Sequence, residues 1–355
     1  MSYTQSEINL IVVDSIAELN YTQKKLLLAS VNNANSNCEK YAKAFISACG
    51  ELSYNRAKAT LFDENYRKNL LEELDKRGIV CVTYKSTVYP EQLKNIPVPP
   101  LVLYARGNVE LLKGQLFAVV GSRKTVEYAY AECKKICAEL AEKFVIVTGV
   151  ADGADSAAAC GALDSGNIIC VLPGGHDSSC TANAKVLKEV EEKGLVISEF
   201  PFGMPARKYT YFLRNRIIAG LSKGVLVVSA ATKSGAINTA TYAIDYSREV
   251  FAFPYNIGIT SGEGCNNLIK KGAYLCDSAN DIFSVFGLEA RQEESISLDK
   301  DERQVLNLLK QDGETHVERI AERLGKQLFE INAVCAMLEI KGLVCRVGGN
   351  KFCAL

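Results

Sequence analysis

The sequence lacks the residue patterns that hold metals and redox cofactors in many proteins. Its 355 residues include only two histidines, His176 and His316, and neither lies in a ligand-spaced cluster. The 13 cysteines form no C-x-x-C pair. Cys133 and Cys137, one helical turn apart, are better explained as a buried helix face than as a metal site. Since the dinucleotide fingerprint G-x-G-x-x-G is also absent, we expect neither a metal nor a nicotinamide or flavin cofactor.

Membrane and secretion signals are missing as well. No apolar run reaches the ~18–20 residues that a membrane helix needs. The apolar run from Ile8 to Val13 is too short for a signal peptide, and no basic segment precedes it. An odd number of scattered cysteines is typical of reduced thiols. We therefore expect a cytoplasmic protein without a membrane partner.

The chain also lacks an excess of charge of either sign. Lys plus Arg number 41, and Asp plus Glu number 41. Any affinity for nucleic acid must therefore come from a local patch. The 48% hydrophobic content is enough for ordinary globular cores.

Residues 1–86 predict a small helical domain, and residues 87–288 an α/β domain. Apolar positions at helical spacing predict four N-terminal helices, with Gly50 and Gly78 as stops; the helices are expected at Ser6 to Leu19, Thr22 to Val31, Asn37 to Cys49 and Glu64 to Arg77. A proline-rich connector (89–100) follows. Short apolar runs alternating with helical segments then predict a doubly wound, mostly parallel sheet; these runs are Leu116–Val120, Phe144–Thr148, Ile168–Leu172, Leu195–Ile197, Val225–Ser229 and Val250–Phe253.

A polar linker at 289–300 leads to a different pattern in residues 301–355. Three helical segments precede two β-like runs joined by Gly348-Gly349-Asn350, a good hairpin turn. The helices are expected at Glu302–Lys310, Val317–Leu324 and Leu328–Lys341, and the strands at Leu343–Val347 and Lys351–Ala354. This order is the outline of a winged-helix domain.

The most informative motif is Gly121-Ser122-Arg123, directly after the first apolar strand. A Gly-Ser turn that opens a helix points backbone amides, and here a guanidinium, at one spot suited to a phosphate. Lys124 is a further candidate. A tight turn with a solvated arginine is the alternative. Similar turns follow other strands, which suggests a sheet edge that holds several phosphates; they lie at Thr148-Gly149, Pro173-Gly174-Gly175, Ser198-Glu199 and Lys233-Ser234-Gly235.

Other candidate site residues each allow two interpretations, one structural and one functional. Asp155, after Gly149 and Gly153, either caps a helix or orients the loop. In Arg214-Asn215-Arg216 the asparagine is a possible helix cap, and the arginines reach either phosphates or a carboxylate such as Glu199. The turn at 173–175 is a possible nucleotide border, but His176 lacks a partner for catalysis.

Taken in order, these motifs resemble the DNA-processing protein A family (DprA, also called Smf). The most specific match is the stretch from Arg214 to Ser222. The other matching elements run from about 85 to 275; they include Tyr89-Pro90, Arg106-Gly107, Gly121-Ser122-Arg123, Gly153-Ala154-Asp155, Ser198-Glu199-Phe200-Pro201, Ser234-Gly235 and Gly264-Cys265-Asn266. The N-terminal helices are compatible with the family's small (SAM/HhH-like) domain, and the C-terminal outline looks like its optional winged helix.

The resemblance implies a Rossmann-like core that binds single-stranded DNA without sequence choice and performs no catalysis. It further implies a homodimer that protects incoming strands and loads a RecA-type recombinase in natural transformation. Arg123 is the first candidate for phosphate contact, and Lys185 is a weaker one. The full predicted DNA-binding set is Gly121, Ser122, Arg123, Lys124, Gly149, Gly153, Lys185, Arg214, Asn215, Arg216, Ser234 and Gly235. The chain departs from the family pattern at Asp152, whose negative charge would repel a strand.

Two other functions stay open. One is a nucleotide-cleaving enzyme similar to the "lonely guy" phosphoribohydrolases, although here Pro173-Gly174-Gly175 is followed by His176-Asp177 and lacks that group's Gly-Thr and catalytic Glu. The other is a protein-interaction or nucleotide-sensing module. The third helix of the winged-helix outline has polar positions of mixed charge, unlike a major-groove reader, so we expect it to dock protein or to bind DNA weakly.

Overall fold

The computed structural model describes residues 3–32, 37–149, 151–178, 183–289 and 298–354. The chain forms two compact units, Met1–Leu288 and Glu289–Leu355. Each is described by itself.

In its described residues, the larger unit holds a nine-stranded sheet that confirms the predicted α/β class. The strand order is β1-β2-β6-β5-β4-β3-β7-β8-β9. Strands β6 to β9 along this order are parallel, and β1 and β2 form an antiparallel edge. The bounds are β1 Val80–Thr83, β2 Val102–Gly107, β3 Leu116–Gly121, β4 Val145–Thr148, β5 Ile168–Val171, β6 Leu195–Ser198, β7 Gly224–Ser229, β8 Glu249–Ala252 and β9 Tyr274–Leu275.

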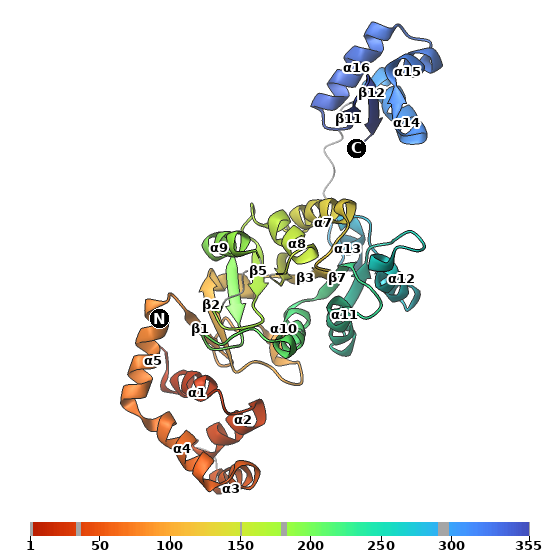
Figure 1. The fold of residues 1–355 in the computed structure, drawn as a ribbon. Coiled ribbons are helices and arrows are strands. Elements are labelled where there is room, and N and C mark those ends of the chain that lie inside the picture. The colour runs from red at the N-terminus through yellow and green to blue at the C-terminus, as the bar shows by residue number, and fades with distance from the viewer. Residues whose placement is uncertain (1–2, 33–36, 150, 179–182, 290–297, 355) are drawn as a thin grey trace. The chain divides into compact units, whose positions relative to one another are not determined.

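Helices cover both faces of this sheet. Figure 1 shows α7 and α8 on one face and α10 and α11 on the other. The helices of this part are α7 Glu127–Leu140, α8 Ala154–Ala162, α9 Ala184–Lys193, α10 Lys208–Leu221, α11 Gly235–Asp245, α12 Glu263–Lys270 and α13 Ala279–Val285.

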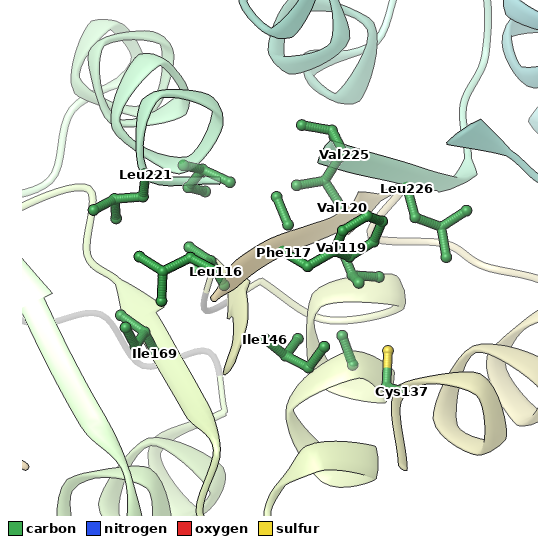
Figure 2. Packing of buried hydrophobic residues seen from close by; sticks show 14 of the residues in the cluster. Leu116, Phe117, Val119, Val120, Cys137, Ile146, Ile169, Leu221, Val225 and Leu226 are labelled. Atoms are coloured by element: carbon green, nitrogen blue, oxygen red, sulfur yellow. The ribbon is translucent and has the colours of Figure 1, made fainter. Parts of the chain in front are cut away.

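The core lies on β3, whose residues Leu116 to Val120 are all buried (Figure 2). The Phe117 ring packs between those of Phe144 and Phe251, with centroids 5.4 and 5.8 Å away. Burial on both faces is the reason that these strands have continuous apolar runs. Cys133 and Cys137 are buried on α7, which confirms their interpretation as a core face. The cysteines in the described part of the chain are free thiols.

The N-terminal helices are α1 Gln5–Ser15, α2 Tyr21–Ser30, α3 Cys38–Cys49, α4 Glu51–Phe62 and α5 Glu64–Lys76. Gly50 ends α3 as predicted, with φ 85°, but the chain at once begins α4, which the sequence analysis missed. The sheet begins at Val80, before the boundary predicted at residue 86, because β1 pairs with β2. The connector contains the short helix α6 Glu91–Lys94, and the 3-10 helix η1 Val109–Lys113 follows β2.

The smaller unit is a winged helix, as predicted. It contains α14 Lys300–Asp312, β10 Thr315–His316, α15 Val317–Leu324, α16 Leu328–Ile340, β11 Val344–Val347 and β12 Lys351–Ala354. The antiparallel strands, in the order β10-β12-β11, close over a core that includes Val305, Ile331 and Phe352. In the described part of both units, no helix has the length and apolar character that crossing a membrane requires.

Candidate nucleic-acid interface

A cavity of about 370 Å³ opens near β3, where the order in which the chain adds strands to the sheet reverses. The chain places β4, β5 and β6 on one side of β3 and then crosses to place β7 on the other. The cavity lies beside this crossover at the carboxyl edge of the strands, where α/β proteins usually bind their ligands. Loop residues after β3 and β4, one face of α10 and the start of α11 line it; they include Gly121, Ser122, Arg123, Asp155, Tyr211, Arg214, Asn215, Ser234 and Gly235.

Two arginines approach one aromatic ring in this cavity. The exposed Arg123 guanidinium lies 5.1 Å from the centroid of the Tyr211 ring, and that of Arg214 lies 6.0 Å from it. Tyr211 and Arg214 share a face of α10 because they are three residues apart. The half-buried ring orients the exposed cation through a cation–π contact. The result is positive charge held beside a stacking surface.

The beginning of α11 is a second candidate anion-binding element. Ser234 occupies the N-cap position in extended conformation, but its side chain makes no capping hydrogen bond. Its Oγ is buried and has no partner among the described residues. Asn215 Nδ2 donates to the Gly235 carbonyl at 3.2 Å and so ties α10 to this turn. A helix N-terminus of this kind offers amide donors and a positive dipole end to an anion.

The Gly-Ser turn contributes less than the sequence predicted. The Ser122 amide donates to the carbonyl and the Oγ of Ser229, at 2.9 and 3.0 Å. The Lys124 amide donates to Ser122 Oγ at 3.2 Å. The expectation that the Ser122 amide is free for a phosphate is therefore wrong, because contacts between β3 and β7 continue past Gly121. Arg123 and the α11 N-terminus remain as candidate anion-binding groups.

Gly149 leaves room for a buried charge pair beneath the cavity. A Cβ on this residue would collide with Arg214 Nη1 and Asp155 Oδ2. Burial raises the pKa of the Asp155 carboxyl, and the facing Arg214 charge lowers it. Asp155 also accepts the Ala151 amide at 3.4 Å, while Gly153 holds the N-cap position of α8. Asp155 therefore orients the loop and does not cap the helix.

Gly153 itself brings two loops together. Its φ is 76°, and a Cβ there would strike the Ser122 carbonyl. The loop after β4 is thus packed directly against the turn that carries Arg123. Asp152, the acidic departure from the family pattern, is exposed in this loop.

The structure separates the other predicted residues from the cavity. Arg216 forms an ion pair with Glu199, and neither residue lines this cavity. Asn215 cannot cap a helix, because α10 begins at Lys208. Lys185 is exposed in the first turn of α9, and Lys124 is exposed beside Arg123. These two lysines lie outside the lining but on the surface.

The space beside the turn at 173–175 is filled by another part of the chain. A Cβ on Gly174 or Gly175 would meet the backbone of the loop 201–206. His176 is 1% exposed, and its Nε2 lies 2.9 Å from the Tyr104 carbonyl oxygen. Burial lowers its pKa to about 4, so the ring is neutral at pH 7. Asp177 pairs with Arg77 and Arg106. This turn is therefore a structural junction packed against the loop 201–206.

Comparisons with known proteins agree with the geometry. Residues 80–287 match the family described as DNA recombination-mediator protein A, and residues 289–350 match the DprA winged helix domain. The chain belongs to this DprA/Smf family. It is a family of DNA recombination mediators.

Relatives and solved structures give the extent of the similarity. The chain is 36% identical to Protein Smf of Escherichia coli over 75% of each chain. It is 38% identical to the DNA processing protein DprA of Streptococcus pneumoniae, covering 56% of this chain and 71% of that one. The match to Protein Smf of Synechocystis spans 60% of that relative's length.

The S. pneumoniae DprA crystal structure aligns with a TM-score of 0.68 at 30% identity, covering 80% of this chain and 98% of that one. A Helicobacter pylori DprA structure aligns with a TM-score of 0.54 at 28% identity, covering 58% and 95%. That structure is described by its single-stranded DNA binding mode.

Sequence reasoning did not single out Tyr211 as the partner of Arg123. The available signal was its spacing from Arg214, which puts both on one face once the helix is known to begin at Lys208.

Proposed function

We propose that this chain binds single-stranded DNA without sequence preference and acts as a recombination mediator. The observation that carries the proposal is the Arg123 guanidinium held over the Tyr211 ring beside the uncapped α11 N-terminus. A phosphate at this position would contact the guanidinium and the first amides of α11. The adjacent ring offers a surface on which a base can stack, as single-strand binders use.

The surroundings favour a flexible strand. The cavity is a crevice of about 370 Å³, which suits one phosphate and its sugar. Nearby on α10, Phe212 is 46% exposed and is available to a neighbouring base. Stacking is tolerant of sequence because every base has a π-face. Asp152 opposes the strand, which predicts modest affinity that depends strongly on salt.

The direct test is a mobility shift with labelled oligo-dT at two salt concentrations. The expected result is a shift that weakens with salt, is stronger than for duplex of equal length, and is much reduced by Arg123→Ala. Equal binding of duplex and single strand would contradict the proposal.

We also propose that the chain works as a homodimer that delivers a strand to a RecA-type recombinase. The edge strand β9 supports the first part. It pairs with β8 alone among the described strands, and its Tyr274 and Leu275 are 44% and 46% exposed. An open apolar edge can pair with a second copy of itself. Sedimentation of Leu275→Lys should show a monomer where the wild type is a dimer, and an unchanged dimer would exclude this edge.

For the winged helix we propose a protein partner. Helix α16, the counterpart of a groove-reading helix, carries Glu330 and Glu339 and no Lys or Arg. Its Phe329 and Ile340 are 72% and 80% exposed. Exposed apolar residues flanked by acids suit a protein surface better than a DNA groove. A sequence-specific footprint on duplex DNA by residues 289–355 would refute this.

We propose a non-catalytic role over the nucleotide-cleaving alternative. The described lining of the cavity contains one carboxylate, Asp155, and this group is buried and faces Arg214. Hydrolysis of a glycosidic bond would need a carboxylate that reaches the substrate. Release of free base from nucleoside monophosphates by the purified chain would overturn this assignment.

A further inference from the structure

A second and larger cavity, of about 820 Å³, lies in the same compact unit on a different side of α10. It is enclosed by four further segments of the chain: the turn between α1 and α2, the loop 97–101, the residues after β6 and the end of α11. It shares no lining residue with the phosphate crevice described above. Its size falls in the range of small-molecule sites.

Two ion pairs line its wall, and the proposed DNA interface uses neither. One is Arg216 with Glu199, from motifs that the sequence analysis singled out. The other is Lys24 with Asp14, whose Nζ and Oδ1 atoms lie 2.9 Å apart. Arg216 is 7% exposed, and its Nη1, like Glu199 Oε2, has no hydrogen-bond partner among the described residues. The two charges neutralise each other, so this pair adds no net charge to the wall of the cavity.

Aromatic rings form much of the remaining wall. Tyr242 and Tyr246 stack on the last turns of α11, with centroids 5.9 Å apart and planes inclined by 21°. Tyr21, Phe200 and Tyr209 face the same space from other elements. Leu213 and Met204 add aliphatic surface between the rings.

The charge of the cavity is negative. Asp14 and Glu199 neutralise Lys24 and Arg216. Glu18 and Asp245 then remain at the rim, exposed and without an ion-pair partner among the described residues. Carboxylates around tyrosine rings repel a phosphate and attract a cation, because the faces of the rings are themselves negative.

We propose that this cavity binds an organic cation, an ammonium or guanidinium group carried on an aliphatic chain. The cationic head lies among Asp245, Glu18 and the tyrosine rings, and its chain packs on Leu213 and Met204. Two sources share this chemistry: a free polyamine, or an arginine or lysine side chain of a protein segment. The cation site is separate from the proposed DNA interface, so the two proposals can be tested independently.

The test is calorimetric titration of the full chain with agmatine, spermidine and a capped arginine peptide. Wild type should bind at least one of them. The double variant Glu18→Gln/Asp245→Asn should weaken that binding about fivefold, since it removes two exposed charges and no buried contact. Tyr246→Leu should weaken it about threefold through loss of the ring face.

The matched control is Glu249→Gln, an exposed carboxylate outside the cavity, which should bind like wild type. Arg123→Ala should bind the cation normally while losing DNA, which separates this proposal from the proposed function. Binding of the amines alone assigns a free ligand, and binding of the peptide alone assigns a protein segment. If none of the three cations binds, or if the double variant binds like Glu249→Gln, the proposal is wrong.

Discussion

Replacing Arg123 by alanine is expected to weaken binding of oligo-dT by about 10- to 100-fold. A hydrogen bond to a charged group contributes about 1.5–3 kcal/mol, and each 1.4 kcal/mol is a factor of ten in affinity. The guanidinium is exposed and makes no ion pair with the described residues. Its removal costs the cation–π contact with Tyr211, about 0.5–1 kcal/mol at an exposed site, so the variant should stay folded and the loss can be assigned to DNA contact.

The salt dependence gives a second, independent magnitude. For a single strand, the slope of log K against log salt is about −0.7 per neutralised phosphate. If Arg123 neutralises one phosphate, Arg123→Ala should make this slope shallower by about 0.7. Arg123→Lys keeps the charge but loses the planar contact with the Tyr211 ring, so it should retain the slope and bind with intermediate affinity. Fluorescence anisotropy from about 50 to 200 mM salt measures both quantities.

Lys113→Ala is the matched control. Lys113 is an exposed cation in η1, near the opposite end of β3, and it pairs with Glu110. Its loss changes the net charge equally but removes no charge from the crevice. The reasoning fails if Arg123→Ala and Lys113→Ala give the same affinity and the same slope.

Four further outcomes are expected. Tyr211→Ala should weaken oligo-dT binding by about 1–3 kcal/mol and Tyr211→Phe by much less, because stacking needs the ring and not the hydroxyl; equal losses in the same anisotropy assay would exclude stacking. Gly149→Ala should lower the free energy of unfolding by about 1–3 kcal/mol, because the added Cβ collides with the buried side chains of Arg214 and Asp155. Wild-type stability of this variant in urea denaturation would show that Arg214 and Asp155 can move aside. The pKa of His176 is lowered from 6.5 to about 4, so the unfolded chain binds a proton before the folded chain does; stability should fall by up to about 3 kcal/mol as pH drops through this window, and a wild-type pH profile in His176→Gln would contradict this. Removal of residues 289–355, a separate compact unit, should leave oligo-dT affinity unchanged, and a large loss would place part of the DNA site there.

The sequence predicted the parallel part of the sheet because its strands are buried on both faces and therefore have continuous apolar runs. It did not predict β1 and β2 as strands. They form the antiparallel end of the sheet, with β1 at the edge, and the proline-rich connector between them masks the pattern. It also missed α4, which has only three buried residues to mark its face, Tyr54, Ala57 and Leu61.

The site was predictable where the signal was local. Arg123 follows a recognisable strand and turn, and it lies in the cavity. Arg214 and Arg216 were predicted to act together, but residues two apart on a helix point in different directions. Arg214 accordingly lines the first cavity, beside Arg123, and Arg216 lines the second cavity. The sequence analysis placed the start of the helix near Asn215. It therefore could not predict that the two arginines lie on different faces of one helix.

The most direct test of the central claim is a crystal structure of this chain with an oligothymidylate. The account predicts a phosphate within hydrogen-bond distance of the Arg123 guanidinium and of the first amides of α11, with a base near the Tyr211 ring. A strand bound elsewhere on the chain, with the cavity beside Arg123 and Tyr211 empty, would contradict it.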